Sequence, residues 1–270
     1  EYRLVDSAIQ RIYIAFSGGA DSVSLLMAML ALGYRERIEA LHCNFTLRGE
    51  ESDQDEDFVR GLCAQYSLPL QGKHFDTRRY SEEQGISIEM AARELRYRWF
   101  RSFTDGSDGR RVVAVAHNAD DQIETMLLNL SMGTGIRGLS GMPFLKAAEG
   151  IIRPLQETSR ALILDYLQAL GQEYREDSSN SDIRYKRNLI RHQLIPLFET
   201  LNPSFREAAS RTIEHLRSTE ALYLESIARY RSSLVSTEGI DYKPLLHHPE
   251  RTSILFELLR PYGFQRSVIE

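Results

Sequence analysis

The feature that most restricts the fold is a regular alternation of short apolar segments and longer amphipathic segments over residues 12–131. The apolar runs predict strands and the amphipathic runs predict helices. The predicted strands are residues 12–16, 37–45 and 111–118, and the predicted helices are residues 23–32, 51–67, 86–103 and 120–131. Strands separated by helices of this length favour parallel βαβ units. We therefore predict an α/β fold with a parallel sheet.

The second half of the chain has a different pattern. Residues 141–155 contain two prolines and predict a hairpin or loop, and residues 159–171 predict a helix that ends at a glycine. From about Pro203 onward the pattern predicts helices with short breaks. We therefore predict a first domain over residues 1–202 and a helical domain over residues 203–270. The last residues, GFQRSVIE, begin a helical pattern, so we expect the second domain to be incomplete.

Composition argues against several classes of protein. The chain has 270 residues, of which 42% are hydrophobic and 26% charged, as in soluble globular proteins. No apolar run approaches the ~20 residues of a membrane span, and we identify no secretory signal. The two cysteines, Cys43 and Cys63, are not spaced as a metal or redox pair, which favours the cytoplasm. The net charge of −5 means that any nucleic-acid surface would be a local basic patch.

A glycine-rich loop, SGGADS, lies between the first predicted strand and the first predicted helix. Its glycines allow backbone amides to approach an anion, its serines offer hydroxyl donors, and the helix N-terminus adds a favourable dipole. The loop lacks the Gly-Lys-Ser/Thr of a Walker sequence, which leaves Asp21 as the carboxylate to hold Mg²⁺. The alternative is a plain tight turn. We predict a phosphate-binding loop made of Ser17, Gly18, Gly19, Ala20, Asp21 and Ser22.

Other polar residues are expected at the same edge of the sheet. His42 and Asn44 end the second strand, and His117 ends the third. Ligands of parallel sheets bind at the carboxyl ends of the strands, so we expect these side chains near the loop. A second glycine run, GTGIRG, fits the dinucleotide fingerprint, but it follows a helix instead of a strand, so we do not predict a dinucleotide site.

Two charged groups complete the candidate residues. Asp121 and Glu124 are three residues apart on a predicted helix and share one face, which suits an ammonium group, a metal or a proton transfer. The segment RYKRNLIR gathers basic side chains that suit an RNA backbone. A solvated helix face is the alternative in both cases.

Six segments together resemble one known family. They are SGGADS, HCNFTLRGEESDQDEDFV, EMAARELRYRWF, AHNADDQIETMLLNLSMGTGIRGLSGM, IIRPL and REDSSNSDIRYKRNLIRHQLIPLFE. In this order, over residues 11–199, they are similar to the tRNA(Ile)-lysidine synthetases among the PP-loop ATP pyrophosphatases. The resemblance implies ATP-dependent attachment of lysine to C2 of the wobble cytidine in the CAU anticodon of tRNA(Ile). An adenylated cytidine would be the intermediate, and pyrophosphate and AMP would be released.

The resemblance also implies roles for single residues. It implies that Asp21, His117, Asp121 and Glu124 are catalytic, with Mg²⁺ on Asp21. ATP would contact the loop residues Ser17 to Ser22 and also His42, Asn44 and His117. Lysine would contact Asp121, Glu124 and Arg191. The tRNA would contact Arg93, Arg184, Lys186, Arg187 and Arg191. The implied partners are ATP, free lysine and tRNA(Ile), without a membrane; a homodimer is left open.

The chain departs from the family at four positions. The family usually has histidine at Phe45, glycine at Thr46, histidine at Asn118 and arginine at Met132. Arg137 is a candidate to replace the arginine missing at Met132. The competing interpretations are a tRNA thiolase, which needs catalytic cysteines, an amidotransferase synthetase, and an inactive RNA-binding module.

Overall fold

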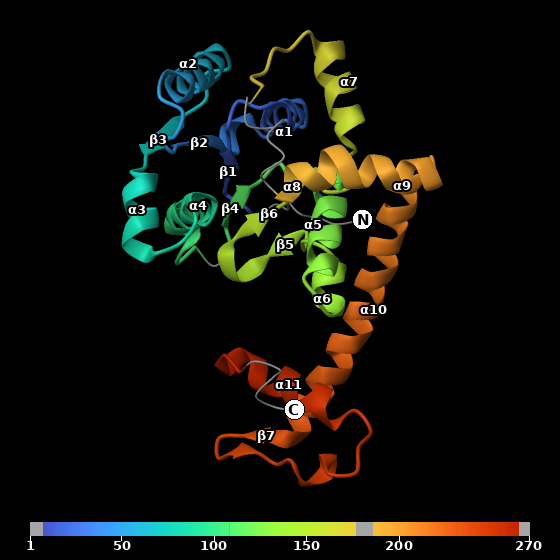
Figure 1. Cartoon of the computed structure of the whole chain (residues 1–270). Coiled ribbons are helices and arrows are strands. Elements are labelled where there is room, and N and C mark those ends of the chain that lie inside the picture. Colours follow the sequence, from blue (N-terminus) through green and yellow to red (C-terminus); the bar gives the residue numbers. More distant parts are fainter. Residues whose placement is uncertain (1–7, 108, 177–185, 265–270) are drawn as a thin grey trace.

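The centre of the molecule is a six-stranded sheet (Figure 1). The structure is a computed structural model that describes residues 8–107, 109–176 and 186–264. The strands, in spatial order, are β3 (Leu70–His74), β2 (Ile38–Asn44), β1 (Arg11–Ala15), β4 (Arg111–Ala114), β6 (Ile151–Ile152) and β5 (Leu145–Lys146). Only β5 runs antiparallel to its neighbour. The predicted α/β fold with a parallel sheet is confirmed.

Helices cover both faces of the sheet. In chain order the first seven are α1 (Ala20–Ala31), α2 (Glu50–Gln65), α3 (Thr77–Gln84), α4 (Ile88–Thr104), α5 (Ala119–Ser131), α6 (Ile136–Leu139) and α7 (Arg160–Leu170). Successive strand residues point to opposite faces, so Ile12 and Ile14 pack with α1, α2 and α7, whereas Tyr13 packs with α4. This burial on both faces explains why the strands are continuous apolar runs.

β3 and α3 are among the elements that have no counterpart in the sequence predictions. β3 is an edge strand with mostly exposed side chains, and α3 reads TRRYSEEQ, so neither has an apolar pattern. In α4, Ala91 and Phe100 are buried, whereas 48% of the surface of Met90 is exposed. The predicted hairpin in residues 141–155 is present as β5 and β6.

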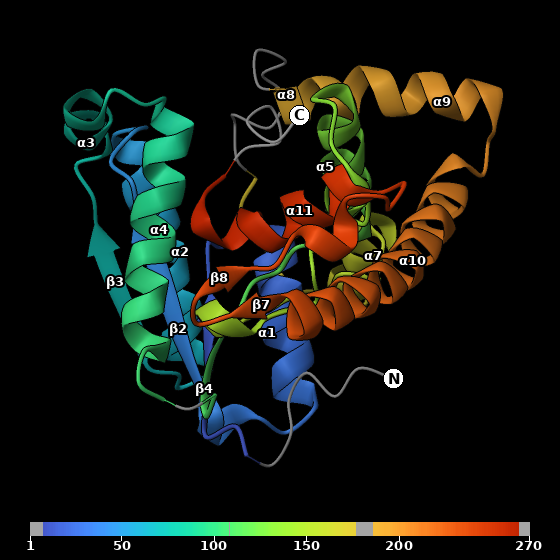
Figure 2. The same cartoon turned by 90° about the horizontal axis from the view of Figure 1, so that it is seen from below.

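The second half of the chain forms two further cores around one long helix. After α8 (Lys186–Leu189), a π-helical turn (Ile190–Leu194) and α9 (Ile195–Leu201), α10 (Phe205–Leu234) runs away from the sheet (Figures 1 and 2). Its first half packs with α5, and its end packs with α11 (Arg251–Leu259). Because α10 joins both cores, the predicted domain boundary near residue 203 stays a prediction. None of the helices in the described residues is long and apolar enough to cross a membrane.

The region after Pro203 is not entirely helical. A short hairpin, β7 (Val235–Ser236) with β8 (Gly239–Ile240), follows α10. Its strands have two residues each, which is too short for the alternation that identifies a strand in a sequence.

The topology defines where a ligand binds. The chain passes from β1 to β2 on one side and later adds β4 on the other side of β1. The carboxyl ends of β1 and β4 are therefore the switch point at which open α/β sheets bind ligands.

Candidate functional site

A cavity of about 300 Å³ opens at this switch point. The chain segments that follow β1, β2 and β4 line it together with α1, α4 and α5. Its polar lining residues are Ser17, Asp21, Ser22, Cys43, Arg96, His117 and Asp121, and its apolar walls include Phe16, Leu41, Phe45 and Phe100. The structure thus brings the predicted loop, His117 and Asp121 to one cavity.

The SGGADS loop is shaped by close packing. Gly18 has a φ of 86°, a conformation that strongly favours glycine. A Cβ added there would lie 3.2 Å from the Phe58 ring and 3.3 Å from Val59, both in α2. The hydroxyls of Ser17 and Ser22 are 3.1 Å apart, and Ser22 Oγ donates to the carbonyl of Gly19 at 2.9 Å. The loop therefore ends directly in α1, and Asp21 and Ser22 in the first turn of this helix line the cavity, where a helix N-terminus favours an anion.

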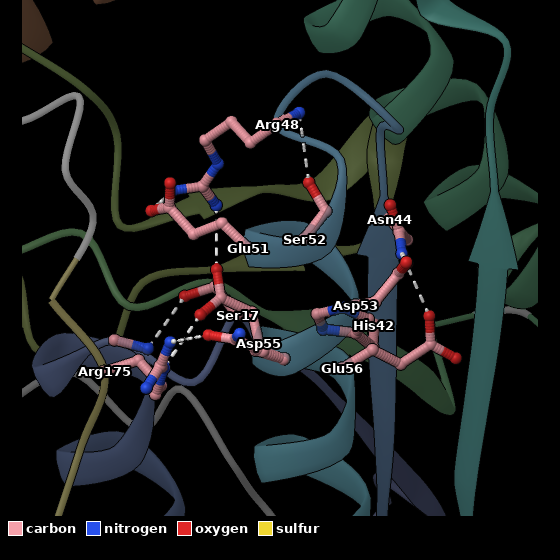
Figure 3. Close-up of polar contacts among 12 residues, drawn as sticks. Ser17, His42, Asn44, Arg48, Glu51, Ser52, Asp53, Asp55, Glu56 and Arg175 are labelled. Carbon is pink, nitrogen blue, oxygen red and sulfur yellow. Dashed lines mark hydrogen bonds and ion pairs between the residues drawn. The ribbon is translucent and has the colours of Figure 1, made fainter.

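The backbone at Arg175, far along the chain, also holds the loop in place. The backbone N–H of Arg175 donates to the carbonyl of Gly18 at 2.9 Å. The Arg175 side chain donates to Asp55 Oδ1 at 3.0 Å, and Arg48 contacts the other oxygen of Asp55 at 2.8 Å (Figure 3). A lone arginine so far along the chain carries no local sequence signal, so the sequence does not predict this contact.

Asp21 lies at the cavity with two partners. Asn118 Nδ2 donates to Asp21 Oδ1 at 3.0 Å, and Arg160 Nη1 lies 2.6 Å from the same oxygen. Among the described residues, no three His, Cys, Asp or Glu side chains group to hold a metal. One carboxylate beside a phosphate loop nevertheless fits Mg²⁺, which usually combines one or two carboxylates with substrate phosphates.

The acid pair lies at the start of α5, where Glu124 is fully buried and the Asp121 side chain is 14% exposed at the cavity. Asn118 caps this helix: its side chain accepts from the Asp121 N–H, and the Asp121 carboxylate accepts from the Asn118 N–H, both at 3.0 Å. Arg191, in the π-helical turn, donates to Glu124 Oε1 at 2.6 Å and lies 3.5 Å from Asp121 Oδ1. Within the described residues, Glu124 Oε2 is buried without a hydrogen-bond partner. The pair therefore offers an acceptor to a cation.

Burial changes the proton affinity of the acid pair. It raises the pKa of Asp121 to about 6, and the nearby charges of Glu124 and Asp21 act in the same direction. The Asn118 N–H and the Arg191 guanidinium oppose the shift. A carboxyl group with this pKa can exchange a proton near neutral pH.

His117 is half-buried and surrounded by arginines. Arg153 Nε donates to His117 Nδ1 at 3.2 Å, so the neutral ring carries its proton on Nε2. Burial, together with the charges of Arg153, Arg187, Arg93 and Arg96, lowers the pKa of His117 to about 3. The ring is therefore a neutral hydrogen-bond donor among cations, which suits a phosphate group.

His42 and Asn44 are not among the residues that line the cavity. His42 Nδ1 donates to the carbonyl of Phe16 at 2.9 Å, and Asn44 donates to Glu56 at 3.1 Å on the α2 face (Figure 3). Strand alternation explains this placement, since Cys43 and Phe45 of the same segment face the cavity. His42 therefore supports the residue before the loop, and Asn44 supports α2 and the Thr46 turn, while contact of either residue with ATP stays a prediction.

The described basic residues predicted to contact tRNA lie in α4, in α8 and, for Arg191, in the π-helical turn. Arg93 is exposed in α4, with its guanidinium 4.9 Å from the Tyr97 ring centre, and Lys186 is exposed at the start of α8. Arg187 donates to Thr125 of α5 at 3.3 Å. Arg184 lies outside the described residues.

The departures from the family have different consequences. Thr46 has a φ of 51°, a left-handed conformation that explains the usual glycine, and its hydroxyl donates to the Phe75 carbonyl at 2.8 Å. Phe45 supports Arg96, whose guanidinium lies 5.0 Å from the ring centre. Met132 is exposed, and Arg137 pairs with Glu257 at 2.6 Å near α11, so Arg137 does not replace an arginine at the site.

The chain resembles several known proteins. A tRNA(Ile)-lysidine synthase of Porphyromonas gingivalis is 47% identical over 269 residues, which cover 100% of this chain and 58% of that protein. The enzyme of the same name from Bacteroides thetaiotaomicron is 45% identical, with coverages of 96% and 60%. The chain thus spans about three-fifths of the length of these relatives.

The fold has a solved counterpart as well. The structure of the U34-tRNA thiolase NcsA from Methanococcus maripaludis with its [4Fe-4S] cluster matches with a TM-score of 0.57 and 19% identity. The match covers 79% of this chain and 74% of that one, and supports the fold alone. The PP-loop domain family matches residues 2–198, and the chain belongs to that family.

Proposed function

We propose that this chain catalyses the ATP-dependent transfer of lysine to C2 of the wobble cytidine in the CAU anticodon of tRNA(Ile). The observation that carries the proposal is the acid pair at the start of α5: Asp121 lines the cavity beside the loop, and within the described residues Glu124 Oε2 has no hydrogen-bond partner. The similarity to two lysidine synthases over nearly the whole chain supports the same reaction.

The first step would use the loop. The cytidine O2 attacks the α-phosphorus of ATP, and the bond to the β,γ-pyrophosphate breaks. The amides of Gly18 and Gly19, the hydroxyls of Ser17 and Ser22 and the N-terminus of α1 would hold the leaving pyrophosphate. Mg²⁺ on Asp21 would supply charge neutralisation when it is bound. His117 would donate its Nε2 hydrogen to the phosphate that becomes AMP.

The second step would use the acid pair. The lysine ammonium would bind between Glu124 Oε2 and Asp121, where it provides the missing hydrogen-bond donor. Asp121, with a pKa of about 6, takes the proton that the amine must lose. The amine then attacks C2, and the C2–O bond to AMP breaks. Arg191 contacts both carboxylates and would hold their geometry at the lysine site.

The tRNA would contact the basic residues of α4 and α8. Arg93, Lys186 and Arg187, together with Arg184 outside the described residues, would contact its backbone. This activity would place the protein in the cytoplasm. A thiolase mechanism fits the chain poorly, because burial raises the pKa of Cys43 to about 12 and that of Cys63 to about 11, which opposes thiolate formation.

The test is incorporation of labelled lysine into unmodified tRNA(Ile) with a CAU anticodon, with and without ATP. A matched tRNA with uridine at the wobble position is the control. We expect ATP-dependent labelling of the cytidine tRNA alone, and Asp21→Ala should abolish pyrophosphate release while tRNA binding survives. Pyrophosphate release without lysine transfer would contradict the proposal and indicate another nucleophile.

A further inference from the structure

The SGGADS loop contains no lysine, but the structure brings a cation to it from a distant part of the chain. Arg160 is the first residue of α7, which packs beside α1 on the same face of the sheet (Figure 1). Its Nη1 lies 2.6 Å from Asp21 Oδ1, and Asp21 lines the cavity. The Arg160 guanidinium therefore contacts Asp21, the residue that directly precedes the loop serine Ser22.

The backbone of Arg160 is fixed, whereas its side chain is accessible. The Arg160 N–H donates to Asp120 Oδ2 at 2.8 Å, and Ser159 caps α7 by accepting from the Leu162 N–H at 3.2 Å. The Arg160 side chain is 38% exposed, and that of Asp21 is 32% exposed. An ion pair this exposed to water is weak, so a phosphate oxygen can replace the Asp21 carboxylate as the partner of Arg160.

We propose that Arg160 binds the β- and γ-phosphates of ATP and the pyrophosphate that is formed from them. Without nucleotide, Arg160 neutralises Asp21. With nucleotide, its guanidinium donates to phosphate oxygens and leaves the Asp21 carboxylate to Mg²⁺. The planar fork of arginine matches two phosphate oxygens, which is the role that the Walker lysine fills as a point charge. This inference rests on the ATP cleavage in the proposed function.

The alternative role for the same contact is that Arg160 only orients Asp21. The two roles differ when metal is removed. A direct phosphate contact persists in EDTA, whereas an effect through metal-bound Asp21 disappears. Titration calorimetry with pyrophosphate in EDTA therefore separates them. The proteins are the wild type, Arg160→Ala, Arg160→Lys and Asp21→Ala, with Arg79→Ala as the control because Arg79 pairs with Glu83 on the exposed surface of α3.

We expect Arg160→Ala to weaken pyrophosphate binding in EDTA by about tenfold to hundredfold, the effect of losing a hydrogen bond to a charged group. Arg160→Lys should restore part of the affinity. Asp21→Ala should strengthen binding, since it removes a negative charge and releases Arg160. AMP, which lacks the β- and γ-phosphates, should bind Arg160→Ala and the wild type equally.

Three results would overturn the proposal. The first is equal binding of pyrophosphate by the wild type and Arg160→Ala in EDTA. The second is a loss of AMP binding in Arg160→Ala as large as its loss of pyrophosphate binding. The third is the absence of pyrophosphate binding by the wild type. Thermal unfolding of each variant identifies general damage, and Arg160→Lys still tests the contact if Arg160→Ala unfolds. The lysine-labelling assay is judged separately, so failure of the proposed function is distinguishable.

Discussion

The raised pKa of Asp121 makes a quantitative prediction for the stability of the protein. The carboxyl titrates at about 6 in the folded chain, against an ordinary value of 3.8 for an aspartate exposed to water, as in the unfolded chain. A difference of about two pKa units corresponds to about 3 kcal/mol. Between these values the folded state holds the proton that the unfolded state has lost, so the free energy of unfolding falls as the pH rises. This contribution is fully present below about pH 4 and is lost above about pH 6.

The variant Asp121→Asn isolates this contribution, because asparagine cannot ionise and can still accept from the Asn118 N–H. The assay is urea unfolding of wild type and variant from about pH 4 to about pH 7. We expect the variant to gain about 3 kcal/mol relative to the wild type over this range. The difference between the two proteins is needed because His117, with a pKa lowered to about 3, has the opposite sign. Its stability contribution is present above about pH 6.5 and is lost as the pH falls towards 3.

Parallel stability curves for the wild type and Asp121→Asn would refute the reasoning. The same carboxyl predicts a kinetic effect: lysine transfer should rise with pH to a plateau, with an apparent pKa of about 6. His117 cannot cause this limb, because its ring is already neutral there. A limb that persisted in the residual activity of Asp121→Asn would contradict the assignment of Asp121 as the base.

Two further predictions concern the loop and the acid pair. Gly18→Ala and Gly33→Ala both place alanine at a φ above 80°, a strain of about 1–2 kcal/mol, but only Gly18 has side chains at 3.2–3.3 Å from the new Cβ. Pyrophosphate release should therefore be lost in Gly18→Ala and kept in Gly33→Ala, and equal activity would contradict the packing argument. Arg191→Met removes the ion-pair partner of the fully buried Glu124. Breaking a buried ion pair lowers the free energy of unfolding by about 3–5 kcal/mol, and we expect about 2–3 kcal/mol here because the Arg191 side chain is 37% exposed. Adding Glu124→Gln should recover most of this loss in urea unfolding, and an additive double variant would show that the pair is not coupled.

The parts of the fold that could be predicted are those with a local pattern. Buried strands and amphipathic helices have characteristic periods. In the loop motif, the glycine at position 18 itself indicates a backbone with positive φ. β3 and α3 have exposed side chains, so no period revealed them. In the site, the sequence correctly places His42 near the carboxyl end of its strand. Strand alternation, however, directs the neighbouring Cys43 into the cavity instead of His42. Arg160 and Arg175 act through contacts with residues more than a hundred positions away, and a sequence alone does not pair such charges.

The glycine run after α5 gains a structural explanation from these contacts. α5 carries the acid pair in its first turns and ends at Ser131, and the run begins at Gly133. Residues of α10 and α11 contact the segment that follows. Arg217 of α10 donates to the carbonyls of Ser140 and Met142 at 3.1 Å, and Arg137 pairs with Glu257 of α11. Gly141 has a φ of 76°, and a Cβ there would collide with the Gln122 side chain, which accepts from the Met142 N–H. Gly133, with a φ of 74°, lets the chain turn after α5, and Gly141 lets it turn after α6, so contacts from α10 and α11 fix the segment that follows the helix of the acid pair.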